Sequence, residues 1–277
     1  KEEIPAVTQL FTPDWIVRYM VENSLGRIFI DKRKEQGVYA DGRGLEEMSW
    51  DEVEAKRISN EEEIAGQMGW KYYLPEAAQT KEVRQQLDEI QKQSEYKDVR
   101  DIKVIDPCMG SGHILVYAFD VLMQMYENDG YSQRDAAQCI LEHNLFGLDI
   151  DPRAYQLAYF AIMMKARQYD RRFLTRGIEP QVYCPKKDED LIEFGSLVKV
   201  DELGEKPQEP TELTLFNMDY EATLNDWNFR RLLAQDYVAV CTNPPYLNKY
   251  NAKLKGFVND KYKDYSGDLF SVFIYRN

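Results

Sequence analysis

Short apolar runs and longer helical patterns alternate along the second half of the chain. The runs over residues 102–105, 145–149 and 237–242 have the length of buried strands, and the first two lead to an aspartate, Asp106 and Asp149. Apolar positions with helical spacing follow each of these two runs. A strand followed by a helix, twice over, predicts an α/β fold with a mostly parallel sheet flanked by helices.

The first hundred residues show a different pattern, with helical signals and long charged stretches. Thr12 followed by Pro13 is typical of a helix start, with Thr12 as the N-cap. Residues 26–80 are charged and irregular, and we expect the acidic run at 61–63 to form a solvated face. We therefore divide the chain into a helical N-terminal segment with an insertion, residues 1–100, and a core, residues 101–277.

The stretch after the first predicted strand has the composition of a ligand-binding turn. Asp106 and Pro107 end the strand, and Gly110 and Gly112 follow with one small residue between them. A strand, a tight glycine turn and a helix together let backbone N–H groups approach a ligand. The alternative is a glycine turn that merely connects two elements, and the motif alone does not separate the two.

The kind of cofactor follows from what this motif lacks and from its charge. A nicotinamide fingerprint has a third glycine and an acid about 20 positions later. Here the nearest acid at a strand end, Asp149, lies 37 positions beyond Gly112. The Asp106 carboxylate would repel a diphosphate and attract a cation. The pattern favours S-adenosylmethionine (SAM), with Asp149 placed to accept hydrogen bonds from the ribose hydroxyls.

A second motif, Asn243-Pro244-Pro245-Tyr246, follows the third predicted strand directly. The prolines fix the backbone and remove two N–H donors, which leaves carbonyl oxygens exposed as acceptors. With the Asn243 amide oxygen and the Tyr246 ring, they suit a planar base that carries an exocyclic amine. The alternative, a proline-rich turn after a strand, is common for the two prolines alone. Residues 246–263 add five lysines and a single aspartate, which are either phosphate contacts or a solvated loop.

Composition narrows the choice of function. The net charge of −13 argues against indiscriminate nucleic-acid binding by the whole surface. The four cysteines and two histidines lack metal-ligand spacing, so we expect no metal site. Reduced thiols favour a cytoplasmic protein, and no apolar run is long enough to cross a membrane. The chain starts without Met and stops inside an apolar pattern, so we expect a piece of a longer protein that lacks a target-recognition domain.

Taken together, these motifs resemble those of the N6-adenine DNA methyltransferases. The order of Phe11-Thr12-Pro13, then the motif at 106–112, then Asn243-Pro244-Pro245-Tyr246 is similar to the order in the gamma group. The longer strings at 9–23 and 106–115 resemble the PglX-like adenine-specific methylases of BREX and phage-growth-limitation defence systems. The resemblance covers most of the chain and is weakest over 26–70 and 170–235.

The resemblance implies a Rossmann-like SAM-methyltransferase sheet of seven strands and a set of cofactor contacts. Ile150 would pack on the adenine ring, and Ser196 stands where the family often has an acid that contacts the cofactor adenine. The residues implied to contact SAM are Phe11, Thr12, Pro13, Asp106, Pro107, Gly110, Gly112, Asp149, Ile150 and Ser196.

The reaction implied is methyl transfer to the N6 amine of an adenine flipped out of double-stranded DNA. The Asn243 oxygen and the Pro244 carbonyl would accept hydrogen bonds from the amine, and Tyr246 would stack on the base; Pro245 completes the motif. Neither a metal nor a covalent nucleophile is needed. The Pro107-Cys108 pair copies a dipeptide of cytosine-C5 methylases, but it lies in the cofactor turn, so we reject a cysteine nucleophile.

Two other functions stay open on the sequence. A methyltransferase for protein glutamine or for ribosomal RNA amines can use the same tetrapeptide. A SAM-binding subunit of a defence complex without turnover of its own is the second alternative, and other defence-system subunits are expected partners in either case. The helix at Thr12-Pro13, upstream of the glycine turn, favours DNA as the substrate.

Overall fold

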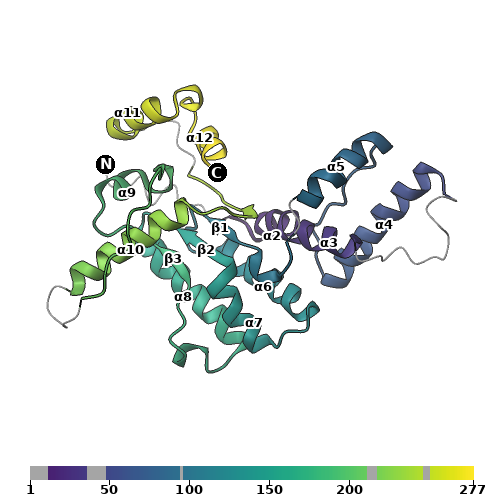
Figure 1. Ribbon diagram of the computed structural model, residues 1–277, viewed down its shortest axis with the longest axis horizontal. Helices are drawn as coiled ribbons and strands as arrows, with labels where there is room; N and C mark the ends of the chain where they lie inside the picture. Colours follow the sequence, from purple (N-terminus) through teal and green to yellow (C-terminus); the bar gives the residue numbers. More distant parts are fainter. Residues whose placement is uncertain (1–11, 36–47, 94–95, 211–216, 246–249) are drawn as a thin grey trace.

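A parallel sheet of four short strands lies at the centre of the computed structural model, which describes residues 12–35, 48–93, 96–210, 217–245 and 250–277 (Figure 1). The strands are β1 (Val104–Asp106), β2 (Leu145–Leu148), β3 (Gln181–Tyr183) and β4 (Ala239–Val240). Their order is β3-β2-β1-β4, and every neighbouring pair is parallel. The predicted α/β class is confirmed. The resemblance implied seven strands, and the described residues form these four.

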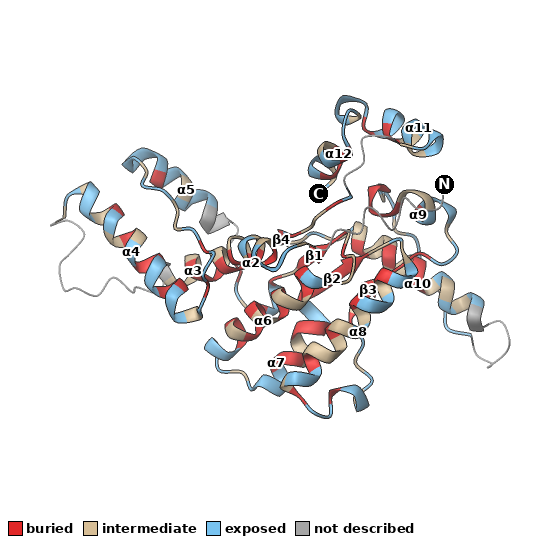
Figure 2. Cartoon of the chain, turned by 180° about the vertical axis from the view of Figure 1, so that it is seen from behind, coloured by how far each residue is buried: buried red, intermediate tan, exposed pale blue. Residues whose placement is uncertain are grey.

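Helices cover both faces of this sheet, which is why β1 and β2 are buried along their length. On one face, α6 (His113–Asn128), α7 (Gln133–Cys139) and α8 (Pro152–Tyr169) share the main hydrophobic cluster with Val104 and Leu145. On the other face, α10 (Asn217–Leu233) packs through Phe229 and Leu232 against Ile105 and Phe146. Figure 2 shows the buried residues concentrated in the sheet and in α6, α7 and α8.

The remaining elements of the second half are short. They are η2 (Val99–Asp101), the π-helical turn η3 (Ile140–Asn144), η4 (Phe173–Thr175), α9 (Glu189–Phe194), η5 (Gly195–Leu197), α11 (Ala252–Lys261), η6 (Lys263–Tyr265) and α12 (Leu269–Arg276). The α11–α12 pair forms a hydrophobic cluster of its own, with Val258 and Val272 inside it. The lysine-rich stretch is therefore helical over 252–261 rather than a loop.

The described residues of the N-terminal part form the helices α2 (Asp14–Glu22), α3 (Leu25–Glu35), α4 (Trp50–Met68) and α5 (Lys81–Gln93). Helices α2 and α3 pack on α6, and Val17, Val21 and Leu25 belong to the same cluster as the sheet. Helices α4 and α5 extend away from the sheet, and we call them, with residues 69–80 between them, the arm (Figure 1). A capping box at Ser49 starts α4, and Gly69 in the left-handed conformation ends it.

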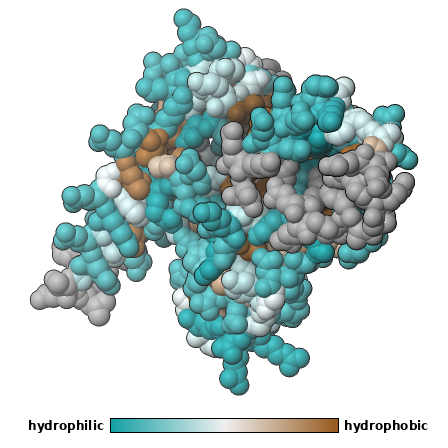
Figure 3. Space-filling view, turned by 45° about the vertical axis from the view of Figure 1, so that its right-hand side comes forward, coloured by the Kyte–Doolittle hydropathy of each residue, from teal (hydrophilic) through white to brown (hydrophobic). Residues whose placement is uncertain are grey.

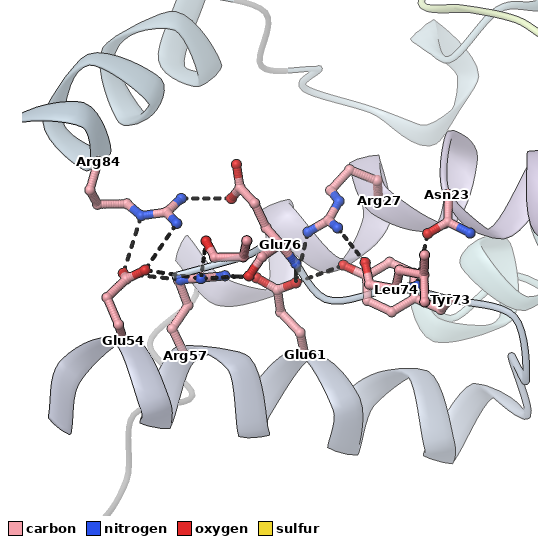
Figure 4. A network of polar contacts seen from close by, with 10 residues as sticks. Asn23, Arg27, Glu54, Arg57, Glu61, Tyr73, Leu74, Glu76 and Arg84 are labelled. Carbon is pink, nitrogen blue, oxygen red and sulfur yellow. Dashed lines mark hydrogen bonds and ion pairs between the residues drawn. The ribbon is translucent and has the colours of Figure 1, made fainter. Parts of the chain in front are cut away.

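The interior of the arm is charged (Figure 4). Glu61 is fully buried and accepts hydrogen bonds from Arg57, from Arg27 of α3 and from the Tyr73 hydroxyl. The expectation of a solvated face at 61–63 is wrong for Glu61, because these donors surround its carboxylate. The same expectation is confirmed for the next two residues, 62 and 63, which are exposed.

Polar side chains cover most of one face of the molecule, in keeping with the acidic composition. The face in Figure 3 is largely hydrophilic, with small hydrophobic patches separated by polar side chains. None of the helices in the described parts of the chain combines the length and the apolar character that a membrane span needs.

Candidate active site

The two motifs separated by more than a hundred residues meet at one edge of the sheet. Strand β1 lies between β2 and β4, so Asp106, Asp149 and Asn243 follow three neighbouring strand ends. The Cys241 N–H donates to the Ile105 carbonyl at 3.0 Å and thereby continues the β1–β4 pairing up to the second motif. Ligands of parallel α/β sheets bind at this carboxyl edge, so the arrangement forms one candidate site.

The glycine turn brings the start of α6 close to α8. Gly110 and Gly112 have φ angles of 53° and 82°, in the left-handed region that side chains disfavour. A Cβ on Gly112 would lie 3.0 Å from the Cβ of Ala158. Gly112 is the N-cap of α6 and no side chain caps this end, so its first backbone N–H groups face the turn.

Asp149 directly follows β2, and its carboxylate bonds to the backbone of the glycine turn. Its Oδ2 accepts the Gly110 N–H at 2.8 Å, and its Oδ1 accepts the Asp151 N–H at 2.8 Å. Burial raises the pKa of Asp149, and these backbone donors oppose the shift. Because a carboxylate offers about four acceptor positions, the held group keeps capacity for a further hydroxyl donor.

Asp106 is the least satisfied polar group of the site. It is 1% exposed, and its Oδ1 accepts the Cys108 N–H at 3.1 Å. Its Oδ2 and the buried Thr242 Oγ1 make no hydrogen bond of full geometry with any described residue, although the hydroxyl lies near enough to the carboxylate to act on its pKa. Burial raises the pKa of Asp106 to about 7, although the nearby Thr242 hydroxyl and the Cys108 N–H lower it in part. A buried oxygen without a donor is costly, and a cationic or hydrogen-bond-donating ligand would satisfy it.

Ile150 and Ser196 lie beside the turn in different ways. Ile150 is 53% exposed, and its Cγ2 lies 2.6 Å from where a Cβ of Gly195 would be, so it covers the Gly195 backbone. Ser196 is buried and donates to the Pro107 carbonyl at 2.8 Å. Ile150 thus presents an apolar surface, whereas the Ser196 hydroxyl ties η5 to the glycine turn.

The second motif contacts the N-terminal helix. The Asn243 Nδ2 donates to Thr12 Oγ1 at 3.0 Å. The N-cap of α2 is Pro13, without a side-chain cap, so the prediction of Thr12 as N-cap is wrong by one residue. The physical reason is that the Thr12 hydroxyl bonds to Asn243 instead of the helix backbone.

The other members of the predicted site have simpler positions. Pro244 is buried and Pro245 is exposed at the end of the described stretch. Phe11 and Tyr246 lie outside the described residues. The Cys108 thiol is held near Ser196 at 3.8 Å, and burial raises its pKa well above the ordinary value, which suits an inert thiol.

Two features of the site were missed by the sequence analysis. A Cβ on Gly147 would lie 2.6 Å from Met109 Sδ, so this glycine lets the turn lie close over β2. A glycine inside a strand is the signal that could have found it. Thr242 became notable only through its buried hydroxyl beside Asp106. No cluster of metal-ligating side chains occurs within the described ranges.

Comparison with known proteins gives the family. The N-6 DNA Methylase family matches residues 59–177, and the family Eco57I restriction-modification methylase matches residues 143–277. The adenine-specific methyltransferase PglX of Lacticaseibacillus casei (strain Zhang) is 39% identical, over 99% of this chain and 24% of its own length. The chain belongs to the N6-adenine DNA methylase family.

A second curated relative belongs to the same family. The adenine-specific methyltransferase BrxX of Escherichia coli O9:H4 (strain HS) is 32% identical, over 99% of this chain and 25% of its own length. The predicted similarity to PglX-like methylases is confirmed, and the chain spans about a quarter of the length of these curated relatives. A nuclease-deletion mutant of the Type ISP restriction-modification enzyme LlaGI, solved with a DNA substrate mimic, shares 13% identity at a TM-score of 0.42, over 93% of this chain and 24% of that one.

Proposed function

We propose that this chain carries the active site of a SAM-dependent methyltransferase that modifies the N6 amine of adenine in DNA, within a BREX-type or related restriction-modification defence system. The observation that carries the proposal is the shared carboxyl edge. There the Asn243 amide follows the strand next to β1, whose end carries the unsatisfied Asp106 carboxylate. A base-binding amide and a cation-binding carboxylate on neighbouring strands suit transfer between two held reactants.

The residues on the β1 and β2 side fit the cofactor. SAM supplies, when bound, an electrophilic methyl group on a sulfonium cation. The Asp106 Oδ2 would attract the cationic methionine end of SAM or accept a hydrogen bond from it. The Asp149 carboxylate would accept from the ribose hydroxyls, and the exposed Ile150 side chain would cover the adenine face.

The remaining residues proposed for the cofactor site would shape the turn beside SAM. Gly110 and Gly112 allow close approach without a Cβ. Pro107 and Ser196 hold the turn and η5 together, while Phe11 and Pro13 would border the methionine end.

The residues on the β4 side fit an exocyclic amine. The N6 lone pair is delocalised into the adenine ring and is a poor nucleophile. Hydrogen bonds from the amine to the Asn243 oxygen and the Pro244 carbonyl would favour a pyramidal nitrogen whose lone pair points at the methyl group. Tyr246 would stack on the base, a contact worth about 1–3 kcal/mol in single-strand binders.

The substrate would be double-stranded DNA with the target adenine flipped out, since the amine is not reachable inside the helix. We further propose that residues 1–100 carry one cofactor-contacting motif, that residues 101–277 form the catalytic core, and that other defence subunits assist it. The four cysteines are free, which supports a reducing, cytoplasmic setting.

The test is the Asn243→Ala variant of the full-length protein. We expect loss of tritium transfer from labelled SAM to DNA, because the amine loses its acceptor, while calorimetry gives a SAM affinity within about threefold of wild type. Asn128→Ala, at the exposed far end of α6, is the matched control and should keep full activity.

Three results would contradict the proposal. If the Asn243→Ala variant stays active, the amide does not have the proposed role. Label found in protein or RNA instead of DNA supports the rival amine methyltransferases. SAM binding without any transfer by the full-length protein supports a cofactor-binding subunit.

A further inference from the structure

The contact between Thr12 and Asn243 joins residues 231 positions apart. The Asn243 Nδ2 lies 3.0 Å from the Thr12 Oγ1, with the amide nitrogen as the donor. The two branches of a planar amide point in different directions, so the Asn243 oxygen is turned away from Thr12. With Nδ2 as the donor, the amide takes one of two orientations that differ by a half-turn, and the Thr12 hydroxyl is its acceptor.

Only one of these orientations serves an amine substrate. The N6 amine brings N–H donors, so it needs the amide oxygen in front of it. The opposite orientation would set the donors of Nδ2 against the donors of the amine and would remove one of the two acceptors. An acceptor beside Nδ2 thus has a chemical effect on the reaction without touching the substrate.

Helix α2 is held firmly enough to serve as the support for this hydroxyl. Its Glu22 is fully buried and accepts from the Tyr117 hydroxyl of α6 at 2.7 Å and from the Tyr72 N–H of the arm at 2.6 Å. Just beyond this C-terminal end of α2, the Ser24 Oγ lies 2.9 Å from the Cys241 Sγ, while Thr12 precedes the N-terminal end. The two ends of α2 therefore contact residues 241 and 243 of the same segment.

We propose that Thr12 is a positioning residue for Asn243: its hydroxyl accepts the amide N–H and holds the amide oxygen toward the target amine. This inference rests on the proposed function. It differs from a cofactor contact, which the motif order alone implied for Thr12, because it acts on the rate of methyl transfer rather than on SAM affinity.

The test compares Thr12→Val, which keeps the shape and loses the hydroxyl, with Thr12→Ser, which keeps the hydroxyl. At saturating SAM and DNA we expect the single-turnover rate of Thr12→Val to fall about tenfold, the equivalent of one hydrogen bond. Thr12→Ser should stay within about twofold of wild type. The SAM dissociation constant of both variants should stay within about threefold.

Thr223→Val is the control for the substitution itself, since Thr223 is exposed on α10 and bonds only to its own helix backbone. An unchanged rate for Thr12→Val overturns the inference, as does a loss found entirely in SAM affinity or a Thr12→Ser variant as slow as Thr12→Val. Asn243→Ala is measured alongside. If that variant is active, the proposed function fails; if it is inactive and Thr12→Val is normal, the positioning role alone fails.

Discussion

The site and the arm both bury carboxylates, and they treat them in opposite ways. Asp106 is 1% exposed and Glu54 of the arm is 3% exposed. Glu54 accepts from Arg57, from Arg84 and from the Gln79 N–H. Among the described residues, Asp106 has one backbone donor and the nearby Thr242 hydroxyl, and its Oδ2 makes no hydrogen bond of full geometry. Equal burial therefore does not mean an equal role.

The pKa values of Glu54 and Asp106 differ because the two carboxylates have different numbers of hydrogen-bond donors. Burial raises the pKa of both groups, but the hydrogen bonds from Arg57, Gln79 and Arg84 outweigh it for Glu54 and lower its pKa to about 2. For Asp106 burial dominates, and its pKa is about 7. A buried acid with all its donors inside the protein stabilises the fold. A buried acid that lacks a donor marks a place where a ligand can supply one.

The largest change in the free energy of unfolding is expected for a variant of the arm, Glu61→Gln. Glu61→Gln removes the charge that Arg57 and Arg27 share, and breaking a buried pair on one side costs about 3–5 kcal/mol of unfolding free energy. Denaturant unfolding measures this loss, and Glu62→Gln on the exposed side of α4 is the control, with a change below about 0.5 kcal/mol. Equal effects of the two variants would show that the network does not stabilise the arm.

The second largest effect is expected for Asp106→Asn, which should raise the free energy of unfolding, and only at high pH. The pKa of Asp106 is raised from 3.8 to about 7 in the folded protein. Without ligand, its contribution to stability is therefore fully present below about pH 4 and is lost as the pH rises through 7. At pH 9, Asp106→Asn should have a larger free energy of unfolding than wild type, by on the order of 4 kcal/mol, with little difference at pH 4.

The same variant should bind SAM more weakly, as calorimetry at pH 8 can measure. Stabilisation together with weaker binding is the signature of a residue kept for its ligand. A variant that is destabilised at pH 9 would mean that Asp106 has a structural partner after all.

The smallest change in the free energy of unfolding is expected for a variant of an exposed ion pair. Lys187 and Asp219 pair at 2.5 Å, but their side chains are 54% and 65% exposed. Asp219→Asn should change the unfolding free energy by about 0.5 kcal/mol or less, because solvent screens such a pair. Unfolding in low and high salt checks this, and a loss as large as that of Glu61→Gln would remove the distinction between buried and exposed pairs.

Local patterns predicted the central elements well. The strands at 104–106, 145–148 and 239–240 and the helices after the first two lie where the periodicity placed them. The glycine turn lies between β1 and α6, and Asp106 and Asp149 lie at the ends of β1 and β2, as the order of the residues predicts. Strand β3 and helix α10 were missed, because β3 has three residues and α10 is interrupted by charges, so neither gives a clear period.

By itself, the sequence indicated the α/β class, the glycine turn and the family, because each strand, turn and motif that carries them is a short run of neighbouring residues. Only the tertiary structure decided that Glu61 is buried among arginines and that Thr12 meets Asn243 across 231 positions. The physical reason is that a polar side chain has no preferred environment until its partners are placed. Packing of distant helices supplies those partners, and no local pattern records which ones they will be.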